Sequence, residues 1–104
     1  MPRFDVHQIA DRGPGSRVVY ALDIQADLLS GLATRLVVPL VPASEFGPPV
    51  KRLNPVFRIG NRNFVMATAE MAAIPRKLIG ERVTSLAGES DEIIAALDFL
   101  ISGI

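Results

Sequence analysis

The chain has 104 residues, of which 49% are hydrophobic and 21% are charged, and its formal net charge at pH 7 is zero. This length and composition predict one globular domain, residues 1–104, that folds without metals or disulfides, and the absence of cysteine excludes thiolate chemistry. No apolar run approaches the ~20 residues of a membrane span and no signal segment opens the chain, which predicts a soluble cytoplasmic protein with no membrane contact.

The charges are unevenly distributed along the chain. Residues 1–82 hold all 11 Lys and Arg and 7 acidic residues, a net charge of +4, whereas residues 83–104 hold only acidic charges and carry −4. This separation argues against a nucleic-acid binder with a broad basic stripe. It leaves open an acidic partner for the basic part of the chain or an ordinary solvated surface.

The first half of the chain predicts three strands. The period-2 alternation of residues 3–8 predicts a half-buried strand on which His7 points outward. The stretch 17–25 is rich in β-branched residues and predicts a long second strand. Residues 34–40 predict a third strand, and because Pro39 lacks an N–H donor we expect this strand to lie at a sheet edge or to stop pairing there.

The second half of the chain predicts a loop, a hairpin and a segment of uncertain type. Residues 41–55 are rich in proline and predict mostly loop. Residues 56–59 and 63–67 predict two strands joined by a turn at 60–62, with a glycine placed for positive φ. Residues 71–83 contain an internal proline and an internal glycine, which exclude one continuous helix.

The last stretch, residues 91–104, predicts a helix. Ser90 is a suitable N-cap, Asp91 and Glu92 lie where the helix dipole favours negative charge, and Gly103 suits the left-handed residue that ends a helix. One face of the helix is apolar, and it is made by Ile93, Ile94, Leu97, Leu100, Ile101 and Ile104. Antiparallel strands followed by one helix predict a mainly β fold, a small barrel or curled sheet with the helix packed on it.

The residues give little support for catalysis. His7 is the only histidine, cysteine is absent, and the carboxylates do not have the spacing of a metal-binding loop. The serines at 44, 85 and 102 are not in a nucleophile-elbow context. We therefore predict no catalytic residues, no cofactor and no metal site, and a protein that is not an enzyme.

Apolar residues at two places lack an evident role within the chain. Leu28 and Leu29 lie in an expected loop, and Ile101 and Ile104 crowd the end of the helix. Burying one such side chain is worth ~1.5–3 kcal/mol, so several exposed ones need a reason. They belong to the core or a homodimer seam, or they form a docking surface for another protein.

Several blocks of the sequence resemble the CcdB toxin family along almost the whole chain. These blocks are LDIQADLL (22–29), RLVVPL (35–40), NPV (54–56), IG (59–60), MA (71–72), IP (74–75), IGE (79–81), DEI (91–93) and the closing GI (103–104). The resemblance implies an SH3-like barrel of the CcdB/MazF type, with antiparallel strands plus a terminal α-helix.

The resemblance also implies a function and partners. CcdB-like proteins are homodimeric toxins of type II toxin–antitoxin modules; they poison DNA gyrase by binding its A subunit, and a CcdA-like antitoxin neutralises them. DNA is contacted only indirectly, through the antitoxin complex. Carried over by position, the gyrase-binding residues are Leu28, Leu29, Asp98, Ile101, Ser102, Gly103 and Ile104.

Three positions or segments depart from the family pattern. Ser102 stands where the family usually has a tryptophan that stacks on a gyrase arginine, Asp98 replaces a neutral amide, and the loop 11–16 near the antitoxin path does not match. The departures at Ser102 and Asp98 favour an alternative, a CcdB-like protein that keeps dimerisation and antitoxin binding, for transcriptional autoregulation, without poisoning gyrase. The departure of the loop predicts a different partner specificity. A MazF-type endoribonuclease shares the barrel and is a third hypothesis, although His7 is poorly placed for it.

Overall fold

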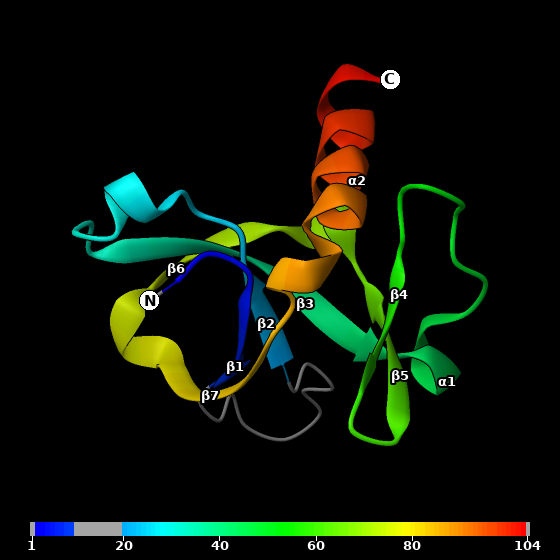
Figure 1. Ribbon diagram of the computed structural model, residues 1–104, viewed down its shortest axis with the longest axis horizontal. Helices are drawn as coiled ribbons and strands as arrows, with labels where there is room; N and C mark the ends of the chain where they lie inside the picture. The colour runs from blue at the N-terminus through cyan, green and yellow to red at the C-terminus, as the bar shows by residue number, and fades with distance from the viewer. Residues whose placement is uncertain (1, 10–19, 104) are drawn as a thin grey trace.

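The computed structural model describes residues 2–9 and 20–103 of the protein, and Figure 1 shows their arrangement. The strands are β1 (Asp5–Ile9), β2 (Tyr20–Asp23), β3 (Thr34–Pro42), β4 (Val56–Ile59), β5 (Arg62–Met66), β6 (Ala72–Pro75) and β7 (Ile79–Ser85). The α-helices are α1 (Ala43–Phe46) and α2 (Ser90–Ser102). The 3₁₀ turns are η1 (Asp27–Leu29), η2 (Thr68–Glu70), η3 (Arg76–Leu78) and η4 (Ala87–Glu89).

The strands form one curled antiparallel sheet. Its order is β4-β5-β3-β2-β1-β7, and β6 pairs with β3 beside β5. Figure 1 shows the sheet wrapping into a half-barrel from which α2 rises. The predicted fold class, a mainly β SH3-like barrel with one terminal helix, is confirmed.

The strand β3 lies inside the sheet, so the prediction that it would end or lie at an edge near Pro39 is wrong. On one side, β3 pairs with β2 throughout residues 37–40. On the other side its partner changes from β6, at residues 34–37, to β5, at residues 40–42. Pro39 lies at this change of partner and its carbonyl accepts the Ala67 N–H at 3.0 Å, so its missing donor falls where no strand needs one.

The hairpin prediction is confirmed. β4 and β5 pair up to Ile59 and Arg62, and the connecting Gly60 has φ +64°. The exclusion of one helix over 71–83 is also confirmed, because that segment contains β6, η3 and most of β7. The expected loop 41–55 does include one helical turn, α1, which lies between the last residue of β3 and Gly47.

The first two strands are shorter than predicted. β1 begins only at Asp5, because Phe4 has a left-handed backbone with φ +71°. β2 ends at Asp23, whose carboxylate accepts the Gln25 N–H at 3.0 Å and turns the chain. The predicted strand residues 17–19 and the loop 11–16 lie outside the described residues.

An apolar core fills the concave side of the sheet beneath the start of α2. Its buried members are Phe4, Val6, Leu22, Ile24, Val38, Leu40, Phe57, Phe64, Met66, Leu86, Ile93 and Ala96. The helix begins one residue earlier than expected: Ser90 is its first residue, Glu89 is the N-cap, and no side chain caps the first turn. The predicted capping role of Ser90 is therefore wrong, whereas Asp91 and Glu92 do occupy the first turn.

The other side of the sheet buries polar groups, and here the prediction for His7 is wrong. His7 is buried, and its Nδ1 lies 3.1 Å from the carbonyl oxygen of Gly80. On the same strand Asp5 accepts a hydrogen bond from Arg82 at 2.9 Å, and on β2 the buried Asp23 pairs with the buried Arg35. The alternation of residues 3–8 identified one buried face but not the second, because that second face is polar.

Candidate protein-binding surface

Among the described residues, the two most exposed large apolar side chains lie in η1 and in the last turn of α2. Leu28 in η1 is 97% exposed, and Ile101 in the last turn of α2 is 75% exposed. Leu29 is half exposed. Isolated apolar residues are normal on a surface, but side chains this exposed, gathered at two projecting segments, are typical of interaction sites.

Polar contacts hold the turn that carries Leu28 against the body of the protein. The Asp27 carboxylate accepts the Arg3 backbone N–H at 2.8 Å. The Gln25 side chain donates to the Leu29 carbonyl at 2.8 Å and accepts the Leu36 N–H at 3.0 Å. Because Gln25 is buried, these bonds tie η1 to β3 and leave its leucines facing outward.

The end of α2 is a capped helix terminus that projects from the body. Gly103 adopts a left-handed conformation with φ +72°, and its N–H donates to the Phe99 carbonyl at 3.0 Å, as predicted for the residue that ends the helix. Figure 1 shows this end of the helix beyond the other elements. The helix therefore ends at Gly103 in a defined turn, next to the exposed Ile101 and Ser102.

The structure places the predicted site residues as follows. Asp98, Ile101, Ser102 and Gly103 are exposed along the outer part of α2. Ile104 lies outside the described residues, so its part in the predicted binding surface stays a prediction. Within the chain, η1 and the end of α2 stand apart (Figure 1), so the fold of one copy does not bring the two predicted parts together.

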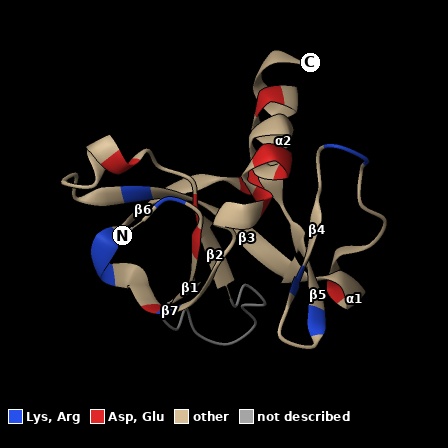
Figure 2. Cartoon of the chain, in the orientation of Figure 1, with Lys and Arg blue, Asp and Glu red and all other residues tan. Residues whose placement is uncertain are grey.

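The electrostatic character of the helix end is acidic. Figure 2 shows only acidic charges along α2, and its last turn contains no basic residue. The unpaired carbonyls at a helix C-terminus carry a partial negative charge, and the nearby Asp98 adds a full one. The surface around Ile101 therefore suits a partner that offers apolar contact together with a cationic group.

Sequence reasoning did not identify two further features near these segments. Leu32 is half exposed, and its N–H donates to the Leu29 carbonyl at 3.1 Å, so it extends the apolar side of η1. The guanidinium of Arg52 lies over the ring of Phe99, 4.8 Å from the ring centroid. The spacing of leucines at 28, 29 and 32 could have indicated the first feature; nothing in the sequence indicates the second.

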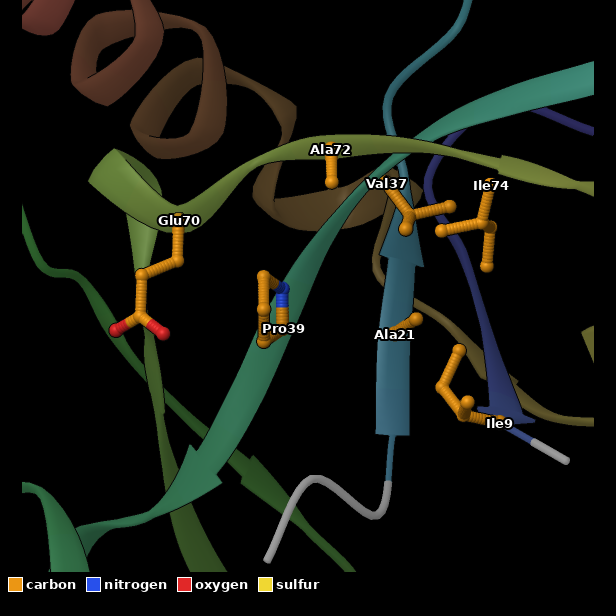
Figure 3. A pocket seen from close by; sticks show the side chains of 7 residues that line it. All are labelled: Ile9, Ala21, Val37, Pro39, Glu70, Ala72 and Ile74. Atoms are coloured by element: carbon orange, nitrogen blue, oxygen red, sulfur yellow. The ribbon is translucent and has the colours of Figure 1, made fainter. Parts of the chain in front are cut away.

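A separate apolar hollow of about 190 Å³ lies on the sheet between β1, β2, β3 and β6 (Figure 3). It is lined by Ile9, Ala21, Val37, Pro39, Glu70, Ala72 and Ile74. Glu70 is the one ionisable group among these lining residues. The hollow therefore offers contact area and no arrangement of acids, bases or nucleophiles that could act on a substrate.

Comparison with known families identifies the chain. A sequence model of the family described as CcdB protein matches residues 3–103, almost the full length. In the parts that the structure describes, no helix has the length and apolar character needed to cross a membrane. The family match agrees with the curled sheet and terminal helix described above. The chain belongs to the CcdB protein family.

Proposed function

We propose that this protein is the toxin of a type II toxin–antitoxin module and that it inhibits DNA gyrase in the cytoplasm by binding its A subunit. The observation that carries this proposal is the family match over residues 3–103, because the CcdB family is one of gyrase-binding toxins and not of enzymes. The exposed aliphatic residues at η1 and at the end of α2 support it, because they occupy the positions that the family resemblance assigns to gyrase binding.

The contact itself is proposed to be apolar with an electrostatic component. Leu28 has nearly its full side chain, and Ile101 about three quarters of its surface, available for burial against gyrase. Ser102 is exposed and cannot stack on an arginine as the family tryptophan does. Asp98 and the free carbonyls of the helix end attract the same arginine through charge, which partly replaces the lost aromatic contact.

We further propose that the protein acts as a homodimer. In one protomer η1 and the end of α2 are separate, so a continuous gyrase-binding surface requires elements from two copies (Figure 1). Static light scattering tests this directly, because a dimer has about twice the 11.2 kDa mass of one chain. A single-chain mass at micromolar concentration would contradict the proposed composite surface.

A calorimetric titration against the dimerisation fragment of the gyrase A subunit from the same host tests the proposed function. Gly103→Glu places a charged side chain in the middle of the proposed contact, and we expect it to abolish binding. Gly60→Glu is the matched control, since Gly60 also has a left-handed backbone, with φ +64°, and a side chain there meets no atom within 4 Å. Binding by the parent and by Gly60→Glu, but not by Gly103→Glu, supports the proposal.

The absence of the tryptophan at Ser102 favours a second candidate function. If the folded parent protein does not bind the gyrase fragment, the protein is a CcdB-like factor that dimerises and binds only its CcdA-like antitoxin. A titration with the antitoxin encoded beside it then gives binding, and expression of the toxin alone leaves growth unchanged. The endoribonuclease hypothesis gains nothing from the structure, because His7 is buried and its Nδ1 lies against Gly80.

A further inference from the structure

The outer half of α2 has little support from the sheet. Within the helix, only Ile93 and Ala96 are buried, and both lie in its first half. At the level of Glu92 and Ala95, an open hollow of about 280 Å³ separates the helix from residues 51, 52 and 55. Leu97 still packs against the core while partly buried, but residues 98 and 100–103 are exposed. Beyond Leu97, core packing therefore does not fix the direction in which the end of the helix points.

A short turn at residues 50–54 stands beside this half of the helix. Figure 1 shows the segment between α1 and β4 rising next to α2, and Figure 2 shows its basic residues at the top. The turn is closed by two reciprocal bonds: the Asn54 N–H donates to the Val50 carbonyl at 2.8 Å, and the Val50 N–H donates to the Asn54 side-chain oxygen at 2.9 Å. It is a compact unit with its own hydrogen bonds.

The same turn is anchored to the end of β5 and to η2. The buried Asn54 side chain donates to the Met66 carbonyl at 3.0 Å, and the buried Thr68 hydroxyl donates to the Leu53 carbonyl. Met66 and Thr68 are both fully buried, and Met66 belongs to the core. The turn is therefore a rigid extension of the sheet that reaches the helix.

Arg52 is the middle residue of this turn and has a strained backbone conformation. Its φ is +70°, a left-handed value that glycine adopts easily and that a branched or long side chain adopts at a cost. Its guanidinium lies 4.8 Å from the centroid of the Phe99 ring, within the range of a cation–π contact. The left-handed backbone and the side-chain contact that spans the gap to α2 therefore occur at the same residue.

We propose that Arg52 is a positioning residue for the projecting half of α2: its guanidinium, held over Phe99 by the 50–54 turn, sets the direction in which the helix presents Ile101, Ser102 and Gly103. This inference rests on the proposed function only in its statement that the positioned residues bind gyrase. The contact itself is a property of the fold. Phe99 directly precedes the exposed residues 100–103, so a contact at its ring restrains the end of the helix more directly than a contact nearer the start of α2.

The mobility of the helix end is the first measurement. Since the chain contains no cysteine, Ser102→Cys gives a single site for a nitroxide label, and electron paramagnetic resonance spectra of label-diluted protein report its motion. Arg52→Met keeps the length of the side chain and the backbone strain but removes the charge, and we expect it to mobilise the label. Arg52→Lys should restore part of the order, because ammonium also binds an aromatic face.

Two further variants separate positioning from general stability. Arg52→Gly relieves the left-handed backbone, so the melting temperature should stay at or above that of the parent although the label becomes mobile. Phe99→Leu keeps apolar bulk without the aromatic face, and combining it with Arg52→Met should mobilise the label no further than either change alone. A label as ordered in Arg52→Met as in the parent would overturn the proposal, as would additive effects in the double variant.

The same unlabelled variants are then titrated against the gyrase A fragment. Arg52→Met should weaken binding about two- to fivefold, the size expected for an exposed cation–π contact. If no protein in the series binds, parent included, the proposed function fails, and the label spectra still decide whether Arg52 positions the helix. If the parent and Arg52→Met bind the fragment equally well although Arg52→Met mobilises the label, Arg52 orders the helix end but does not contribute to gyrase binding, and that part of the proposal is wrong.

Discussion

The two halves of α2 have the same amphipathic pattern but differ in how far their apolar side chains are buried. In the first half Ile93 and Ala96 are completely buried in the core, whereas in the second half Ile101 is 75% exposed. The difference arises because the sheet ends beneath the first half and the helix continues past it (Figure 1). An apolar face on a helix therefore indicates that the face is buried in some contact. How far the sheet extends beneath the helix decides whether that contact is within the protein or with a partner.

The largest effect that should separate the two halves is on stability. Ile93→Ala removes buried methyl groups and leaves a cavity, which should lower the free energy of unfolding by about 2–5 kcal/mol. Ile101→Ala is the matched change in the exposed half and should alter it by less than about 0.5 kcal/mol. Urea denaturation followed by circular dichroism measures both. Equal losses at the two positions would show that the outer half of α2 is packed in the folded protein.

A gain of affinity should come from the exposed half alone. Ser102→Trp restores the aromatic residue that the family usually has, and a tryptophan at an interface centre is worth about 2 kcal/mol or more when truncated. We expect the variant to bind the gyrase A fragment roughly tenfold more tightly, with the unfolding free energy unchanged. Ser85→Trp, at the exposed end of β7, controls for nonspecific stickiness. No gain at position 102 would mean that the helix end contacts gyrase differently from the family pattern.

The smallest of these effects should come from η1. Leu28→Ser removes an apolar side chain that is 97% exposed, so the fold loses nothing, and binding to gyrase should weaken roughly fivefold, or about 1 kcal/mol. Leu32→Ser removes the neighbouring leucine, which the family resemblance does not include. Isothermal titration of both variants shows how far the binding surface extends along η1; an unchanged affinity in Leu28→Ser would exclude η1 from it.

Much of the fold follows from local sequence patterns. The Gly60 hairpin, the break of the 71–83 segment and the left-handed Gly103 were predictable because each depends on the backbone preferences of one or two residues. The candidate site was visible as apolar residues without a role at 28, 29 and 101. The positions are readable because a large aliphatic residue in a turn or at a chain end conflicts with its surroundings in any fold.

Other features depend on neighbours distant in sequence, and the sequence alone did not determine them. Pro39 lies inside the sheet, at the residue where β3 changes partners. His7 is buried, and its ring lies against the carbonyl oxygen of Gly80 in β7, 73 residues further along the chain. The contact of Arg52 with Phe99 joins residues 47 positions apart, and its geometry depends on how the 50–54 turn is anchored to β5. Local patterns report what a residue prefers; only the tertiary structure decides which preferences are met and which side chains remain for a partner.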